Sequence, residues 1–493
     1  MLNILPFQDR FRPALPTVMG NVDYLEFERQ LKRIDEVLGL SGIEKDFVEK
    51  SLAHWSQKIH VSLDKIKEKT RLKFQQESRQ ALRCTLAKTL MGEGVRDFST
   101  QLAGMPLLQW FCGVDTWGVI RVPAKSSIDR YSRWLSEDQM REVVSGCLKA
   151  VGQNDALFCL EEPLDFEAYF ADTTCVKTNI HFPVDWVLLR DAVRTLMKAV
   201  IKIREQGLKH RMEEPEEFLR QMNRLCIEMT HTRRKKKARR EQKRVLRLMK
   251  KLVGVVERHA KRYRELLDCQ WKETEWTRPQ AEQFLKRIDS VLTQLPQARK
   301  QAHERIIGGR LVENKDKILS LYETNTNVIV RGKAGAESEF GNTLLLGETR
   351  QGLIIDWNLW KESAPADSRM LQESLARVER ALEIKIKEVG GDRGFDSEGN
   401  QNYLEEAKIY NGICPRDPKK LKKQMKKDRF SKIQKRRSQT EGRVGIFKNN
   451  FLGRPLRVKG FENRQLAITW AVLAHNLWVI ARLPRKQVLA KAA

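Results

Sequence analysis

The hydrophobic and polar positions along the chain divide it into helical and strand-like stretches. Residues 47–90 carry apolar side chains at helical spacing among charged ones. Residues 126–139 combine polar residues suited to capping a helix with aromatic and basic positions. The chain up to about residue 155 is therefore predicted to be helical. Both a helix-turn-helix that reads DNA and an ordinary helical bundle fit this pattern.

A strand-like segment and a long helical segment follow. Residues 166–176 are aromatic and β-prone, which predicts a strand with Asp172 near its end. Residues 187–304 are helix-like again and contain the basic run 233–251, in which Glu241 is the only acid. An extended basic helix is predicted there. Such a helix could bind DNA phosphates along its length, extend into solvent as an arm, or contact a partner, and we favour binding of DNA phosphates.

The next part of the chain again has the sequence pattern of β-strands. Residues 342–357 contain two apolar runs joined by 347–352, which predicts a hairpin with a longer loop. A helix is predicted over roughly 367–382, and residues 384–392 alternate like a strand that ends on an acid, Asp392. With the helical insertion removed, the order is three strands, a helix, a strand and further helices. That order is the plan of an RNase H-like α/β core.

The last long apolar stretch, residues 466–481, is interrupted by His475 and Asn476, which favours a buried helix over a membrane span. The N-terminus lacks the pattern of a secretory signal. Four apolar residues of the stretch recur at three- and four-residue spacing and predict one buried face. They are Trp470, Leu473, Leu477 and Ile480.

The predicted organisation has four parts. A helical N-terminal DNA-binding domain covers 1–155, and the RNase H-like catalytic core covers 156–186 and 305–483. A basic helical insertion covers 187–304, and a tail covers 484–493.

The net charge changes this picture most. The 493 residues include 92 Lys and Arg against 64 Asp and Glu, a formal charge of +28, which favours a polyanion partner. The eight cysteines form no C-x-x-C pair, which indicates reduced thiols in an intracellular protein and not a disulfide framework or zinc site. The sequence has neither a phosphate-binding G-x-x-x-x-G-K-[ST] nor a G-x-S-x-G motif, so ATPase and serine-hydrolase functions have no support.

The acids at the strand ends are the candidate chemistry. Neighbouring strands can place Asp172 and Asp392 side by side, and with a third acid from a helix they would form an oxygen-rich site for Mg²⁺ or Mn²⁺. Two such ions, about 3.5–4 Å apart, stabilise the attacking and leaving oxygens of a phosphoryl displacement. The sequence therefore predicts a site for two divalent ions.

Glu441 is the candidate third acid. It lies seven residues before Lys448, so the two fall within about 20° of each other on a helix, and Arg437 lies one turn before Glu441. Glu441 could then reach the metal ions while Arg437 and Lys448 face the same phosphodiester. The alternative is an ordinary surface pair between Glu441 and Arg437. Gly442 and Gly445 weaken the helix prediction by about 1 kcal/mol each.

Two further aspartates are rivals for roles in the site. Asp396 lies beyond the predicted strand end and is interpreted as a turn or cap residue in preference to a metal ligand. Asp185 is interpreted either as a residue that supports the site or as a simple loop acid.

These residues occur in stretches that resemble the DDE transposases of bacterial insertion sequences, closest to the group labelled ISNCY. Each motif is weakly specific alone, but their order and spacing are strongly so. In the related signature a tyrosine stands three positions before the arginine that corresponds to Arg437, and here that position is Gln434. The long insert of this chain lies before the hairpin, whereas some relatives carry a β-rich insert between the second Asp and the Glu. The stretches are 171–185, 330–336, 391–397, Arg437 to Glu441 with Lys448, and 474–477.

The resemblance implies that Asp172, Asp392 and Glu441 bind two divalent metal ions. It further implies that Arg437 and Lys448 hold transposon-end DNA. The partners expected are double-stranded DNA and further copies of the chain, as a homodimer or higher oligomer, with no membrane and a cytoplasmic, nucleoid-associated location. The basic run adds five expected DNA contacts. They are Arg233, Arg234, Lys235, Lys236 and Lys237.

Three functions stay open on the sequence. The first is a transposase that cleaves transposon ends and transfers the freed 3′-hydroxyl to target DNA. The second is an RNase H-like nuclease without strand transfer, and the third is a catalytically inactive relative that binds nucleic acid. The presence of all three acids argues against the third.

Overall fold

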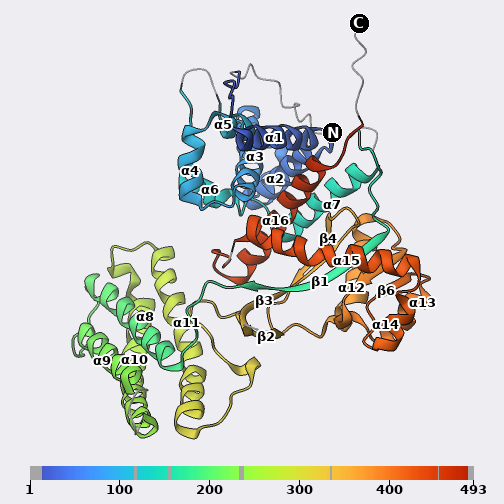
Figure 1. Cartoon of the computed structure of the whole chain (residues 1–493). Coiled ribbons are helices and arrows are strands. Elements are labelled where there is room, and N and C mark those ends of the chain that lie inside the picture. Colours follow the sequence, from blue (N-terminus) through green and yellow to red (C-terminus); the bar gives the residue numbers. More distant parts are fainter. Residues whose placement is uncertain are drawn as a thin grey trace. The chain divides into compact units, whose positions relative to one another are not determined.

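In the computed structural model, the described chain forms two compact units (Figure 1). Unit 1 comprises residues 1–176, 343–360 and 364–493, and unit 2 comprises 177–342 and 361–363. The structure describes residues 14–115, 119–153, 158–232, 238–333, 336–453 and 455–486.

Unit 1 begins with a set of helices. The first starts at Asn21, whose side chain accepts a hydrogen bond from the Tyr24 N–H at 2.9 Å, so the initial turn is capped as the sequence pattern requires. The set is α1 (Val22–Leu40), α2 (Ile43–Ile59), α3 (Glu68–Leu90), α4 (Val95–Gly104), α5 (Pro106–Cys112), α6 (Lys125–Tyr131) and α7 (Glu137–Gln153).

The last helix, α16 (Phe461–Arg482), packs against α1, α3 and α7, so the N-terminal and C-terminal helices share one core. The four predicted residues are all buried: Trp470 at 2% exposure, and Leu473, Leu477 and Ile480 at 0%. Because most of the other residues in the middle of α16 are buried too, the helix lies inside the unit. No helix in the described part of the chain is long and apolar enough to cross a membrane.

A six-stranded mixed sheet follows the N-terminal helices in the chain. Its order is β2-β3-β1-β5-β6, and β4 also pairs with β3. The β3–β4 hairpin is antiparallel, whereas β1, β5 and β6 are parallel to one another. The strands are β1 (Ala168–Lys177), β2 (Asn327–Lys333), β3 (Ala336–Glu348), β4 (Ile354–Leu359), β5 (Glu388–Gly391) and β6 (Tyr410–Ile413).

Helices connect and cover these strands. Helix α12 (Asp367–Leu382) joins β4 to β5, and the short helix η5 with α13 joins β5 to β6. After β6 come α14 and α15, and α15 packs on β5 and β6. The elements are η5 (Arg393–Phe395), α13 (Glu398–Glu406), α14 (Pro418–Gln424), α15 (Asp428–Ile446) and the π-helix η6 (Phe447–Leu452).

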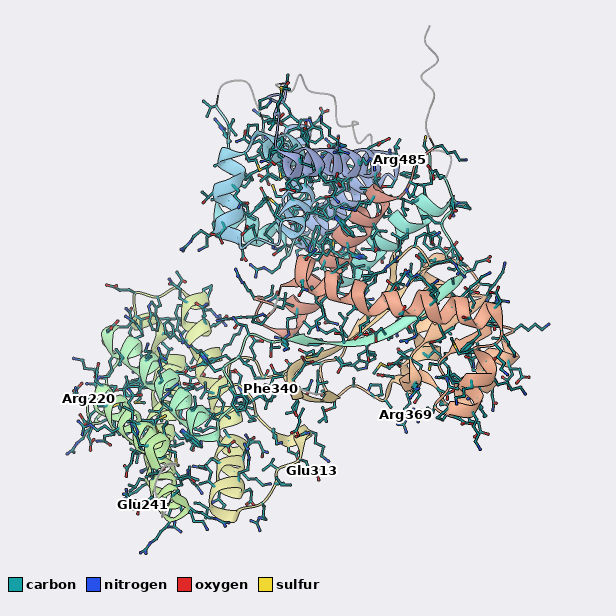
Figure 2. All side chains as sticks on the ribbon, in the orientation of Figure 1. Arg220, Glu241, Glu313, Phe340, Arg369 and Arg485 are labelled. Atoms are coloured by element: carbon teal, nitrogen blue, oxygen red, sulfur yellow. The ribbon has the colours of Figure 1, made fainter. Side chains whose placement is uncertain are left out.

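Unit 2 is a helical bundle with its own apolar core. Helix α10 buries Val245, Met249, Val253 and others at three- and four-residue spacing and turns its basic residues outward, as the amphipathic pattern predicts. Glu241, labelled in Figure 2, accepts a hydrogen bond from Arg244 Nε at 3.0 Å. The helices are α8 (Asp185–Glu205), α9 (Pro215–Thr232), α10 (Ala238–Gln270) and α11 (Arg278–Ala302).

Most predicted elements are present, with several corrections. Helix α12 has the predicted bounds, and the hairpin forms at the predicted place. Asp172 lies in the middle of β1 and not near its end, and the sequence analysis did not predict β2, with seven residues, or β6, with four. The N-terminal helices and the core also share unit 1, so the predicted boundary at 155 does not separate the two units.

Candidate active site

The two candidate aspartates belong to neighbouring parallel strands: Asp172 lies in β1, and Asp392 directly follows β5. Ala168, Tyr169 and Phe170 of β1 pair in register with Glu388, Val389 and Gly390 of β5. Continuing this register by two residues sets Asp172 opposite Asp392, the residue directly after β5. Adjacent strands lie about 4.8 Å apart, so the two carboxylates start from neighbouring backbone positions.

Both aspartates also share a face of the sheet. Ala168 and Phe170 pack with Ile433 of α15, whereas Tyr169 and Ala171 belong to the core on the opposite face. Side chains alternate along a strand, so Asp172 lies on the α15 side together with Phe170 and Thr174. Asp172 and Asp392 are both half-buried there.

Backbone groups orient each aspartate. Asp392 caps η5, and its Oδ1 accepts the Gly394 N–H at 2.8 Å. Asp172 Oδ1 accepts the N–H of Thr173 at 2.8 Å. Each of these bonds joins one carboxylate oxygen to an uncharged backbone donor.

Helix α15 approaches the sheet closely at two glycines of the strands. A Cβ at Gly390 would lie 2.7 Å from the Phe170 ring, and one at Gly412 would lie 2.6 Å from Ile433 Cγ2. Both positions therefore require glycine, and the close packing brings the whole helix over the face that carries Asp172.

The predicted stripe of Glu441 and its basic neighbours follows this helix. Glu441 is exposed on α15, and Arg437 Nε donates to Gln434 Oε1 at 3.1 Å. Gln434 in turn donates to the Gly412 carbonyl at 2.6 Å, so the residue at the atypical signature position anchors α15 to β6. The helix persists through both glycines, and Lys448 lies just beyond it in η6.

Lys448 reaches the aspartate face directly. Its Nζ donates to Thr174 Oγ1 at 2.9 Å, and Thr174 is two residues from Asp172 on the same side of β1. A cation beside two carboxylates is suited to neutralise a phosphate that these carboxylates contact through metal ions.

Sequence reasoning missed the residue that fastens α15 to the hairpin, Arg436. It is buried and donates to Glu348 Oε1 at 2.9 Å, to the Thr349 carbonyl at 2.7 Å and to the Arg350 carbonyl at 2.6 Å. Thr440 Oγ1 donates to the same Glu348 oxygen at 2.7 Å. The spacing of the buried residues along α15 was the available signal, because it places position 436 inward and 437 outward.

A second arginine of α15, Arg443, lies over the hairpin turn. Gly352 has φ +91°, and a Cβ there would fall 1.5 Å from Arg443 Nη1, so only glycine fits this turn. Burial, and after it the nearby charge of Arg436, lowers the pKa of Arg443. Two inward-facing arginines therefore fix the helix against one turn.

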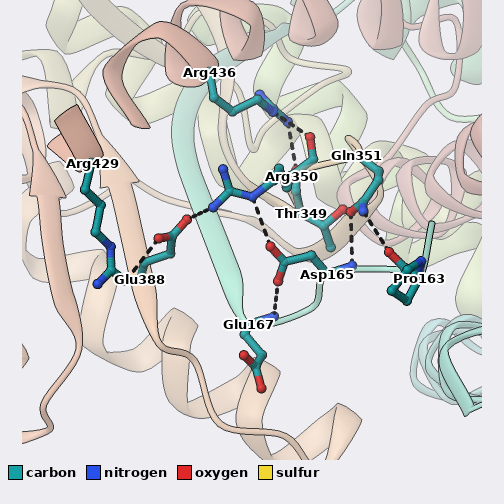
Figure 3. Close-up of polar contacts among 9 residues, drawn as sticks. All are labelled: Pro163, Asp165, Glu167, Thr349, Arg350, Gln351, Glu388, Arg429 and Arg436. Atoms are coloured by element: carbon teal, nitrogen blue, oxygen red, sulfur yellow. Dashed lines mark hydrogen bonds and ion pairs between the residues drawn. The ribbon is translucent and has the colours of Figure 1, made fainter. Parts of the chain in front are cut away.

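Figure 3 shows how the same turn is joined to β5. Arg350 donates to Asp165 Oδ2 at 3.0 Å and also binds Glu388. Arg429 of α15 reaches the other oxygen of Glu388 at 3.2 Å and lies over the Tyr410 ring at 4.1 Å. The strand that leads to Asp392 and the helix that carries Glu441 are thus held by one polar network.

The two rival aspartates have other partners. Asp396 Oδ1 accepts from Gln401 at 2.7 Å and its Oδ2 accepts the Arg416 N–H at 2.8 Å, as expected of a turn residue. Asp185 starts α8 in unit 2, is buried, and accepts from Gln301 at 2.8 Å and Arg305 at 2.9 Å. It is therefore a helix residue and not a simple loop acid.

The structure brings together only part of the predicted site. Within the described residues, no group of three or more His, Cys, Asp or Glu side chains is placed to hold a metal ion, so Glu441 does not complete a cluster with the two aspartates. The metal-binding role of the three acids therefore stays a prediction. Five predicted DNA contacts lie outside the described residues. They are Arg233, Arg234, Lys235, Lys236 and Lys237.

One family model matches part of the chain. Residues 345–477 match the transposase DDE domain. The matched segment includes Asp392, Arg437, Glu441 and Lys448, whereas Asp172 precedes it. The resemblance to insertion-sequence DDE transposases is thus confirmed over the transposase DDE domain. No curated protein and no solved structure matches the chain.

Proposed function

We propose that the protein is an insertion-sequence DDE transposase that cleaves DNA at transposon ends and joins the freed 3′-hydroxyl to target DNA. The observation that carries the proposal is the parallel register of β1 and β5, whose continuation by two residues would set Asp172 opposite Asp392. The match to the transposase DDE domain over the segment that holds Asp392 and Glu441 supports it. The strand order β3-β1-β5-β6, with β4 paired to β3, supports an RNase H-like assignment for the core.

The donor atoms fit a hard divalent cation. Asp172 and Asp392 offer carboxylate oxygens from neighbouring strands, and Mg²⁺ and Mn²⁺ prefer such ligands. Asp172, Asp392 and Glu441 would hold the two ions. When bound, the ions would supply charge stabilisation for an in-line displacement at phosphorus.

The chain's own residues would bind and orient the DNA. Lys448, held by Thr174 beside the aspartates, would neutralise a non-bridging oxygen of the scissile phosphate. Arg437, on the exposed side of α15, would hold a neighbouring phosphate of the same strand. Arg436 does not share this role, because Glu348 and the hairpin carbonyls engage it.

The partner proposed is duplex DNA, both the element's ends and its target. Because two ends must be brought together before joining, we infer a homodimer or higher oligomer on DNA, acting at the bacterial nucleoid. Strand transfer adds the requirement that a free 3′-hydroxyl replaces water as nucleophile at the same site.

The decisive experiment uses the full chain with duplexes that carry the DNA flanking the gene, with Mg²⁺ or Mn²⁺. Asp172→Asn, Asp392→Asn and Glu441→Gln should each abolish cleavage, because an amide lacks the charge that holds the ions against the phosphate. Binding of Mn²⁺, measured by electron paramagnetic resonance, should weaken in all three. Affinity for DNA should largely survive, since basic residues supply most of it.

Asp396→Asn is the matched control and should retain cleavage and Mn²⁺ binding. Cleavage that survives Asp172→Asn or Asp392→Asn would contradict the proposal. Cleavage with no joined product, under conditions that supply target DNA, would instead favour an RNase H-like nuclease.

A further inference from the structure

A dense group of exposed cations lies between β6 and α15. It occupies α14 and the turn that follows, and all of its members are exposed. We name it the lysine platform. Its members are Lys419, Lys420, Lys422, Lys423, Lys426 and Lys427.

Among the described residues, the lysine platform has no acidic partner. None of the six side chains forms a hydrogen bond or salt bridge with a residue in the part of the chain that the structure describes. The two acids of the segment are engaged otherwise: Asp417 caps α14 through the Lys419 backbone N–H at 2.8 Å, and Asp428 pairs with Lys432 at 2.7 Å. By contrast, basic residues of α10 such as Arg244 and Lys261 have acidic partners.

This concentration of like charge has a cost. Lys419 and Lys423 are four residues apart in α14, and like charges at that spacing destabilise a helix by a few tenths of a kcal/mol. A partner that carries regularly spaced negative charge would remove the repulsion. Lysine side chains are flexible point charges, which suit phosphates of any sequence better than one shaped ligand.

The position of the platform relates it to the candidate active site. Arg416, just before α14, donates its backbone N–H to Asp396 at 2.8 Å and its Nε to the Arg393 carbonyl at 3.1 Å. Both acceptors lie in the turn that follows Asp392. The other end of the platform leads directly into α15, which carries Glu441.

We propose that the lysine platform binds the phosphate backbone of duplex DNA next to the phosphodiester at the carboxylates. The inference rests on the proposed function for its location. Seven residues of helix span about 10 Å, over which one DNA strand presents about three phosphates. The platform is therefore large enough to hold a short backbone segment and set the direction in which the duplex leaves the site.

The test compares DNA binding of the full chain with that of a fourfold variant, Lys419→Gln, Lys420→Gln, Lys422→Gln and Lys423→Gln. Fluorescence anisotropy with a duplex of unrelated sequence is measured over a series of salt concentrations. The slope of log Kobs against log[salt] should become shallower by about 3, because each lost phosphate contact removes about 0.9. Replacing the same four residues by arginine should restore the slope.

A control variant removes four charges elsewhere. Lys198, Lys209, Lys272 and Lys286 are exposed residues of unit 2, and changing them to glutamine should alter the slope by less than about 1. Ethylation-interference mapping then locates the phosphates. Ethylation of the phosphates that the platform holds should reduce binding of the wild type but not of the fourfold variant. These phosphates should lie on one side of the cleavage position.

The outcomes separate this inference from the proposed function. A slope change no larger than that of the unit 2 control would show that the platform is a solvated face, even if Asp392→Asn abolishes cleavage. If the fourfold variant shows the shallower slope but the wild-type protein never cleaves DNA, only the proposed function is overturned. A fourfold variant with an intact slope and an unchanged interference pattern would refute the platform.

Discussion

The buried pair between Glu348 and Arg436 should hold α15 on the sheet, and Glu348→Gln tests this. Arg436 Nη2 lies 2.9 Å from Glu348 Oε1, and the two side chains are only 8% and 5% exposed. The substitution keeps an oxygen for Thr440 but leaves the guanidinium without its counter-charge. Removing one partner of a buried pair costs about 3–5 kcal/mol. The Thr349 and Arg350 carbonyls still accept from Arg436, so we expect a cost near 3 kcal/mol.

Native-state hydrogen exchange followed by mass spectrometry measures this locally, which matters because two units need not unfold together. At about 1.4 kcal/mol per tenfold change, protection of the α15 and hairpin amides should fall roughly 100-fold. The surface pair between Asp428 and Lys432, at 79% and 72% exposure, is the matched control. Asp428→Asn should change protection by less than about threefold.

A double variant isolates the charge from the packing. Glu348→Leu with Arg436→Met replaces the pair by apolar side chains, and such replacements are often neutral. Protection in the double variant should return to within about tenfold of the wild type. A tenfold or smaller loss in Glu348→Gln, or a double variant no better protected than the single one, would refute the reasoning.

Two further predictions concern α16. Leu473→Ala should lower the free energy of unfolding of unit 1 by about 2–5 kcal/mol because Leu473 is fully buried. Val22→Ala, at 74% exposure in the same unit, should change it by less than about 0.5 kcal/mol in urea titrations. Burial lowers the pKa of His475 to about 4, so between about pH 6.5 and 4 the unfolded chain binds a proton that the folded chain does not. The free energy of unfolding should therefore fall by up to about 3 kcal/mol as the pH drops through that window. His475→Gln should make this fall smaller, whereas the exposed His181→Gln should not. An equal dependence on pH in the wild type and both variants would contradict the lowered pKa of His475.

The sequence predicted the elements well where local pattern determines them. The bounds of α12 followed from helical spacing, and the hairpin followed from two apolar runs around a glycine-containing loop. The burial of α16 followed from its composition. Short strands such as β6, with four residues, were missed because too few positions are available to establish a period of two.

The candidate site shows where local pattern stops being sufficient. The sequence identified Asp172, Asp392 and Glu441 as candidates, but it could not distinguish Arg437 from Arg436 by chemistry, since both are arginines one residue apart. Their opposite roles depend on which side of α15 meets the hairpin. Likewise, the separate partners of Asp396 became evident only from the turn that it joins to Arg416.

The sequence by itself determined the types of the elements, the excess of positive charge and the set of candidate acids, because these depend on residues close together in the chain. Tertiary structure alone decided that β1 pairs in parallel with β5, whose end leads into Asp392, and that Arg436 meets Glu348 and the hairpin carbonyls. The physical reason is that strand register and helix docking are set by packing between segments far apart in sequence, such as Phe170, Gly390 and Ile433. Periodicity indicates which face of an element is buried but not what covers it.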